Sequence, residues 1–90
     1  MGAAAEAIKT KLEAAFSPQR LEVEDDSARH HGHAGAREGG ESHFNVLIVA
    51  GAFAGVGRVQ RQRAVYAVLA EELAGPVHAL SVKALAPDET

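Results

Sequence analysis

Three histidines within four positions are the residues of this chain whose types and spacing most clearly permit chemistry. His30, His31 and His33 form the run HHGH together with one glycine. A neutral imidazole is a good ligand for zinc, copper or iron, and a glycine-rich loop can bring such side chains to one ion. The same run also fits a solvated loop whose histidines bind nothing, and the residues alone favour that second interpretation.

A metal site here would need a further ligand, because His31 and His33 are too close in sequence to chelate one ion easily without a partner. His78 is the natural partner, since it begins a predicted strand at a sheet end that the loop could cover. A single histidine in a strand is more often a packed residue with one hydrogen bond, and His43 receives that structural interpretation. The chain has no cysteine, so thiolate ligands must come from another molecule.

The motifs of common enzymes are missing from the sequence. It has no cysteine nucleophile, no Ser-x-Gly elbow and no metalloprotease helix motif. The acidic cluster of Glu22, Glu24, Asp25 and Asp26 is explained by solvation at a strand edge, and GAFAGVGR lacks the Lys-Ser/Thr of a Walker loop. We therefore expect no catalytic activity.

Length and composition predict one small globular domain over residues 1–90, with 47% apolar and 23% charged residues. No apolar run approaches the roughly 20 residues of a membrane span, and MGAAAEAIKTKLEAAF lacks the pattern of a signal peptide. A cytoplasmic location is therefore expected. The net charge of -3 argues against strong, sequence-independent attraction to phosphates.

The hydrophobic periodicity predicts an α/β (α+β) fold. An amphipathic helix with Ile8, Leu12, Ala15 and Phe16 on one face ends at the SP pair. A strand over 21–25 and a strong strand over 42–50 form an antiparallel hairpin. In the second strand, the pattern places one set of side chains on the core face: Phe44, Val46 and Ile48. The opposite face carries the alternate residues: His43, Asn45, Leu47 and Val49. Between the strands, residues 28–40 form a flexible loop rich in histidine and glycine.

The second half of the chain predicts a short helix near Phe53, a long helix over 58–73 and a third strand over 77–84. The apolar spacing of the long helix runs through Val59, Tyr66, Leu69 and Leu73, with Val65 and Val68 beside them. Gly75 and Pro76 end that helix, and residues 86–90 form a frayed tail. The helical crossover makes strands two and three parallel. The expected order is α-β-β-α-(α)-β, with helices on one face of a three-stranded mixed sheet.

A group of basic residues offers a second kind of site. Arg58, Arg61 and Arg63 open the long helix, and Lys83 lies on the neighbouring strand, so these side chains could contact phosphates. Arginines interrupted by apolar residues are more often a solvated helix face. The glycines of GAFAG are one residue too far apart for the GXXG clamp of a KH domain.

Four stretches, in order and spacing from Ile8 to Glu89, resemble the BolA family: IKTKLEAAFSPQRLEVEDDS, ESHFNVLIVAGAFAG, RQRAVYAVLAEEL and GPVHALSVKALAPDE. The resemblance implies a three-stranded mixed sheet covered by helices and related to the class II KH architecture. One departure is that the family often has R-H-R before the V-Y pair, whereas here Gln62 lies between the two arginines.

The resemblance also implies a partner and a cofactor. BolA proteins of the histidine-loop type form complexes with monothiol glutaredoxins in which a [2Fe–2S] cluster bridges the two proteins. Carried over to this chain, the ligands are His78 and His30, with His31 or His33 as alternates for His30. Glutaredoxin and its glutathione supply the thiolates, and the free protein is expected to be apo and monomeric. Histidine ligation should raise the reduction potential and make cluster binding sensitive to acid.

The function so implied is that of a non-enzymatic adaptor in iron–sulfur cluster trafficking or iron regulation. Some family members are described as transcriptional regulators with a KH-like surface. The alternative implied for this chain is therefore a DNA-binding regulator that uses Arg58, Arg61, Arg63 and Lys83.

Overall fold

A computed structural model of the chain describes residues 3–25, 43–75 and 77–90. The elements in chain order are α1 (Ala3–Phe16), β1 (Arg20–Asp25), β2 (His43–Val49), the 3-10 turn η2 (Gly51–Phe53), α2 (Arg58–Val68), α3 (Ala70–Ala74), β3 (Ala79–Leu85) and the 3-10 turn η3 (Pro87–Glu89). This order confirms the predicted α/β architecture, and η2 is the short helix expected near Phe53. None of the helices in these residues is long and apolar enough to cross a membrane.

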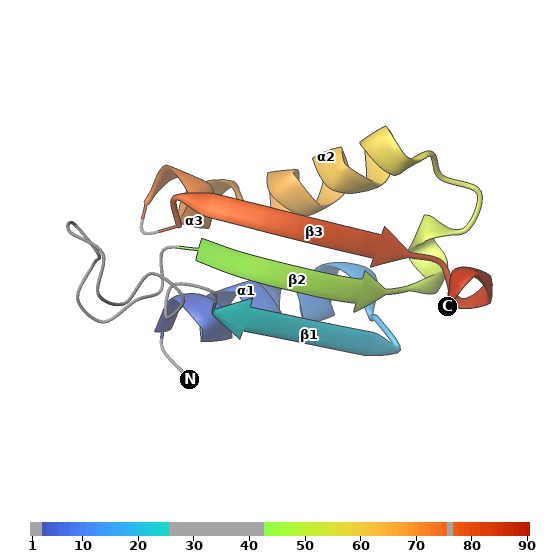
Figure 1. Cartoon of the computed structure of the whole chain (residues 1–90), viewed down its shortest axis with the longest axis horizontal. Coiled ribbons are helices and arrows are strands. Elements are labelled where there is room, and N and C mark those ends of the chain that lie inside the picture. The colour runs from blue at the N-terminus through green and yellow to red at the C-terminus, as the bar shows by residue number, and fades with distance from the viewer. Residues whose placement is uncertain (1–2, 26–42, 76) are drawn as a thin grey trace.

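The three strands form one mixed sheet in the order β1-β2-β3. β1 pairs with β2 in antiparallel orientation, and β2 pairs with β3 in parallel orientation. The parallel pair requires a crossover, which α2 and α3 provide. Figure 1 shows α1 and α2 on the same side of the sheet, so no helix within residues 3–25, 43–75 and 77–90 covers its other face, which is called the uncovered face below.

The core lies between the covered face of the sheet and the helices. The alternation of β2 buries Phe44, Val46 and Ile48, as predicted for a strand with one face on the core. α1 contributes the fully buried Ile8 and Leu12. At the far end of α1, the Phe16 ring lies 5.1 Å from the Phe53 ring, between centroids, so η2 closes this end of the core.

Several side chains differ from the predicted pattern. Ala15 is exposed, and Val49, expected on the uncovered face, is buried at the end of β2. The predicted stripe of the long helix was wrong at Val59 and Tyr66, which are 62% and 39% exposed. The buried stripe of this helix passes instead through three residues spaced four apart: Arg61, Val65 and Leu69.

Two predicted boundaries and the tail also need correction. The helix over 58–73 is divided at Leu69, whose backbone angles (φ -101°, ψ 18°) leave the helical range. β3 begins at Ala79 rather than Val77, because the Val77 N–H donates to the Glu72 carbonyl at 3.0 Å. Residues 86–90, expected to be a frayed tail, contain the ordered turn η3.

α2 is attached to the outer edge of β3 by three side chains. The Tyr66 hydroxyl donates to the Leu80 carbonyl at 3.0 Å, and Gln62 Nε2 donates to the Val82 carbonyl at 2.6 Å. Arg61 Nη1 donates to the carbonyl of Ala84 at 3.0 Å. Every second carbonyl along this edge therefore accepts a hydrogen bond from the helix.

Candidate functional site

His78 lies between two anchored residues, directly before β3. On one side, Val77 is buried and its N–H is bonded to Glu72. On the other side, Ala79 pairs with His43 in the parallel ladder. The His78 side chain itself is exposed. The structure therefore holds the backbone at His78 in place while leaving the imidazole accessible, which contradicts the interpretation of His78 as a packed strand residue.

The described residues that flank the histidine-containing segment lie at the same end of the sheet as His78. Asp25, the last residue of β1, pairs with Phe44, and His43 begins β2 beside Ala79. The described residues on either side of 26–42 thus lie at the same end of the sheet as His78. The predicted loop 28–40 and its ligand candidates His30, His31 and His33 lie outside the described residues.

The donor atoms of the described residues define which metal chemistry is possible there. No group of three or more histidine, aspartate or glutamate side chains within 3–25, 43–75 and 77–90 could hold a metal ion. The chain also has no cysteine. An exposed imidazole on a fixed backbone fits a single nitrogen ligand to a metal centre whose other ligands come from elsewhere.

The turn that anchors His78 is tied to the first helix. The Lys11 ammonium lies 2.8 Å from Glu71 Oε1 and 2.8 Å from Glu72 Oε2. These hydrogen bonds raise the pKa of Lys11, and the Lys11 ammonium lowers the pKa of Glu71. Because the Glu72 carbonyl binds Val77, the clamp between α1 and α3 supports the connection that leads to His78. The sequence pattern gives no sign of this clamp, since sixty residues separate Lys11 from Glu71.

The basic residues predicted to contact nucleic acid divide into two groups. Arg58, Arg61 and Lys83 line a small depression of about 140 Å³ between α2 and β3. Arg63 is exposed and is not among the residues that line it. The structure therefore brings three of the four predicted residues together.

Arg61 is not available to phosphate in this arrangement. Only 6% of the residue is exposed, and its guanidinium donates to the Val56 carbonyl at 2.7 Å and to the Ala84 carbonyl. Its Nη1 and Nη2 bind the two carboxylate oxygens of Glu89 at 2.5 and 3.0 Å. The hydrogen bonds from Arg61 lower the pKa of Glu89 to about 2. The prediction of Arg61 as a phosphate contact is therefore corrected: the residue holds η3 against the helix and β3.

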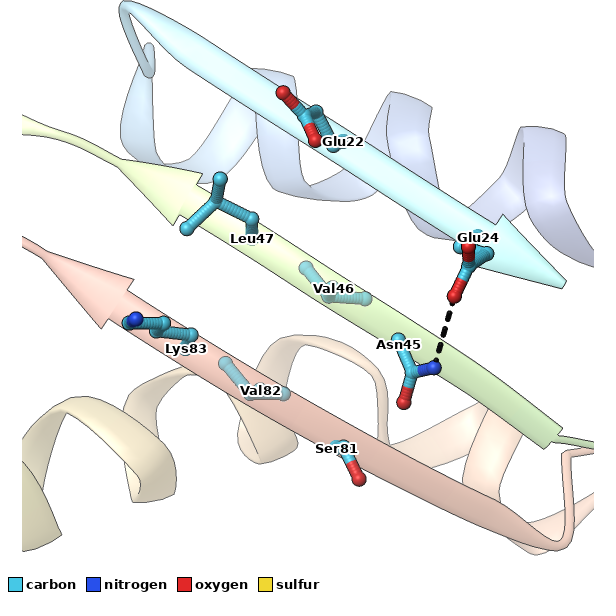
Figure 2. Close-up of a pocket in the computed structure, with 8 residues that line it drawn as sticks. All are labelled: Glu22, Glu24, Asn45, Val46, Leu47, Ser81, Val82 and Lys83. Atoms are coloured by element: carbon cyan, nitrogen blue, oxygen red, sulfur yellow. Dashed lines mark hydrogen bonds between the residues drawn. The ribbon is translucent and has the colours of Figure 1, made fainter. Parts of the chain in front are cut away.

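The uncovered face of the sheet carries a second, larger hollow of about 350 Å³, which the sequence analysis did not predict. Its lining comes from all three strands (Figure 2): Glu22, Glu24, Asn45, Val46, Leu47, Ser81, Val82 and Lys83. Lys83 therefore borders both hollows.

The fold defines a class of protein, a small α/β domain with a three-stranded mixed sheet covered on one face. The solved BolA domain of SufE1 from Arabidopsis thaliana has this fold: it superposes with a TM-score of 0.87 at 43% identity, covering 100% of this chain and 99% of that chain. A family model described as BolA-like protein matches residues 12–89. This chain belongs to the BolA-like family, as the resemblance implied.

Two proteins with similar sequences carry different names. BolA-like protein 1 from Homo sapiens is 51% identical over 81 residues, which cover 90% of this chain and 56% of that protein. The DNA-binding transcriptional regulator BolA from Escherichia coli (strain K12) is 48% identical over 77 residues, covering 86% of this chain and 70% of that protein. The chain thus spans little more than half the length of BolA-like protein 1. Neither name is that of an enzyme.

Proposed function

We propose that this chain is a non-enzymatic adaptor that binds a monothiol glutaredoxin and co-ligates a [2Fe–2S] cluster shared between the two proteins. It would act in iron–sulfur cluster trafficking or iron regulation in the cytoplasm. The observation that carries the proposal is the exposed imidazole of His78 on an anchored backbone, at the sheet end where the histidine-containing segment leaves and rejoins the sheet.

The ligand set of the proposal follows from the donors that the chain has. His78 supplies one nitrogen, and His30, or in its place His31 or His33, supplies a second. Because the chain has no cysteine, the thiolates come from the glutaredoxin and its bound glutathione. The cluster is then cargo held jointly, and neutral imidazole in place of thiolate raises its reduction potential. Without the partner, we expect the chain to be apo.

The proposal is tested by adding wild-type chain to a cluster-loaded monothiol glutaredoxin in the presence of glutathione. We expect the visible circular dichroism spectrum to change, because replacing a ligand alters the asymmetry around the iron atoms. The change should saturate at one chain per cluster, and the coloured species should elute as a heteromeric complex in size-exclusion chromatography. The controls are the loaded glutaredoxin alone and the chain alone. A spectrum that is unchanged on addition of the chain would refute the proposed cluster ligation.

Binding of DNA is a second candidate function. It is favoured by the 48% identity to the DNA-binding regulator from Escherichia coli and by the depression that Arg58 and Lys83 line together. In this proposal Arg58 and Lys83 contact phosphates and Arg63 extends the basic surface. Arg61 takes no direct part, because its guanidinium is bonded to Glu89 and to the backbone.

The double variant Arg58→Ala/Lys83→Ala tests this second function. With two phosphate contacts removed, we expect affinity for a duplex DNA at low salt to fall about tenfold and the salt slope of the binding constant to decrease by about two. Fluorescence anisotropy at increasing NaCl concentration measures both quantities. Arg63→Ala, on the same helix but outside the depression, is the matched control and should have the smaller effect. Equal affinities of wild type and double variant would rule out this surface.

A further inference from the structure

The face of the sheet that points away from the helices is hollowed and carries mixed charges. Figure 2 shows the polar side chains and Leu47 in front of the strands, with Val46, Val82 and the helices behind them. β1 contributes Glu22 and Glu24, β2 contributes Leu47, and β3 contributes Lys83. Acidic groups therefore lie on one edge strand and an ammonium on the other, with an apolar side chain between them.

The strand register places three of these residues on one line across the sheet. Glu22 pairs with Leu47 in the antiparallel ladder, and Leu47 pairs with Lys83 in the parallel ladder. Because neighbouring strands are about 4.8 Å apart, Glu22 and Lys83 originate about 10 Å from each other on either side of Leu47. This row reads acidic, apolar, basic from β1 to β3.

The charged groups of the row remain able to bind a second molecule. Glu22 pairs with Arg20, but both side chains are more than half exposed, and such surface pairs contribute little. A carboxylate also has lone pairs for more than one donor. Within the part of the chain that the structure describes, the Lys83 ammonium takes part in no hydrogen bond or ion pair.

We propose that this row is self-complementary and that two copies of the chain associate face to face through it. A two-fold axis parallel to the strands and above β2 turns the row end to end. Glu22 of each copy then lies opposite Lys83 of the other copy, and the two Leu47 side chains meet at the axis. This is an isologous interface, in which one patch serves both copies, and sheets stack in this way at about 10 Å with interdigitating side chains.

The association is weak and electrostatic. Only one large apolar side chain per copy is buried at the axis, and the ion pairs are close to solvent. Salt therefore weakens the dimer, because the Debye length is about 10 Å at 0.1 M ionic strength. The monomer predicted from the sequence is the dilute form, and the dimer forms at high protein concentration. The inference does not depend on cluster or DNA binding.

Charge reversal at the two ends of the row tests the interface. In a Lys83→Glu dimer, Glu22 of each copy lies opposite the introduced glutamate of the other copy. In a Glu22→Lys dimer, the introduced lysine of each copy lies opposite Lys83 of the other. Each variant alone should therefore associate at least about tenfold more weakly than wild type. In an equimolar mixture the native glutamate meets the native lysine, and the introduced glutamate meets the introduced lysine. The mixture should therefore recover the association of wild type. Sedimentation equilibrium at low and high NaCl concentration measures this.

The equimolar mixture of Lys83→Glu and Glu22→Lys distinguishes this interface from any other. Recovery in the mixture supports it, since a dimer formed elsewhere on the molecule would not respond in this way. Both variants should fold, because both positions are exposed, and far-ultraviolet circular dichroism checks this. A wild-type chain that stays monomeric at every concentration and salt would overturn the inference. So would a dimer that neither reversal weakens, or a mixture that associates no better than its components.

Discussion

The His78→Ala variant is expected to leave the visible circular dichroism spectrum of a cluster-loaded glutaredoxin unchanged, where wild type alters it. His78 is the one predicted ligand among the described residues, and its imidazole is exposed, so its removal takes away a ligand without opening the core. The melting temperature of the variant should therefore stay within a few degrees of wild type. Titration of the variant into the loaded glutaredoxin, with thermal unfolding measured in parallel, checks both expectations.

His43→Ala is the matched control, because His43 lies at the same end of the sheet but is partly buried in β2. We expect it to retain the spectral change. Single alanine variants of His30, His31 and His33 then identify the second ligand, and His30→Ala should have the largest effect of the three. If His43→Ala removed the signal while His78→Ala kept it, the assignment of His78 would be wrong even though cluster ligation itself stood.

Arg61→Ala is expected to lower the melting temperature by roughly 5–10 °C, a large effect for a chain of this size. The guanidinium is the donor to the carbonyls of Val56 and Ala84, and it binds the carboxylate of Glu89. Its loss removes the donor that these acceptors share and releases η3 from α2. Arg63→Ala, at an exposed position on the same helix, is the control and should change the melting temperature little. Similar melting temperatures for the two variants would contradict the structural role of Arg61.

The same ion pair gives stability a defined dependence on pH. The hydrogen bonds from Arg61 lower the pKa of Glu89 from 4.5 to about 2. The unfolded chain therefore binds the proton more readily than the folded chain, and the contribution is complete above pH 4.5 and is lost as the pH falls toward 2. In Glu89→Gln, the melting temperature should depend less on pH between 4.5 and 2 than it does in wild type. The effect is modest and decreases with salt, because the Glu89 side chain is 40% exposed.

The sequence predicted most of the fold because burial of one face makes apolar residues recur at the period of a strand or a helix. The alternation of Phe44, Val46 and Ile48 required one covered face, and the helical length between the second and third strands required a parallel crossover. The charge of Arg61 predicts a phosphate contact, whereas its position in the helix predicts burial. It precedes the buried residues Val65 and Leu69 by four and eight positions, so the helical period alone placed it on the core side.

The exposure of His78 could not be obtained from the same pattern. His78 has the parity of Leu80 and Val82, and a strand starting at Val77 would turn its side chain toward the helices. The strand starts two residues later because the Val77 N–H bonds to Glu72, a contact that depends on how the helix ends. The row of Glu22, Leu47 and Lys83 depends likewise on the register of two ladders, which alternation alone does not determine.

The hydrogen bonds from Tyr66, Gln62 and Arg61 to β3 have a consequence for how the molecule behaves in a crowded solution. An exposed sheet edge is a template on which another extended chain can add, and this is a common route to aggregation. A strand arriving beside β3 would have to displace three side-chain donors before it could reach the carbonyls of Leu80, Val82 and Ala84. The helix thus protects this edge against intermolecular sheet growth.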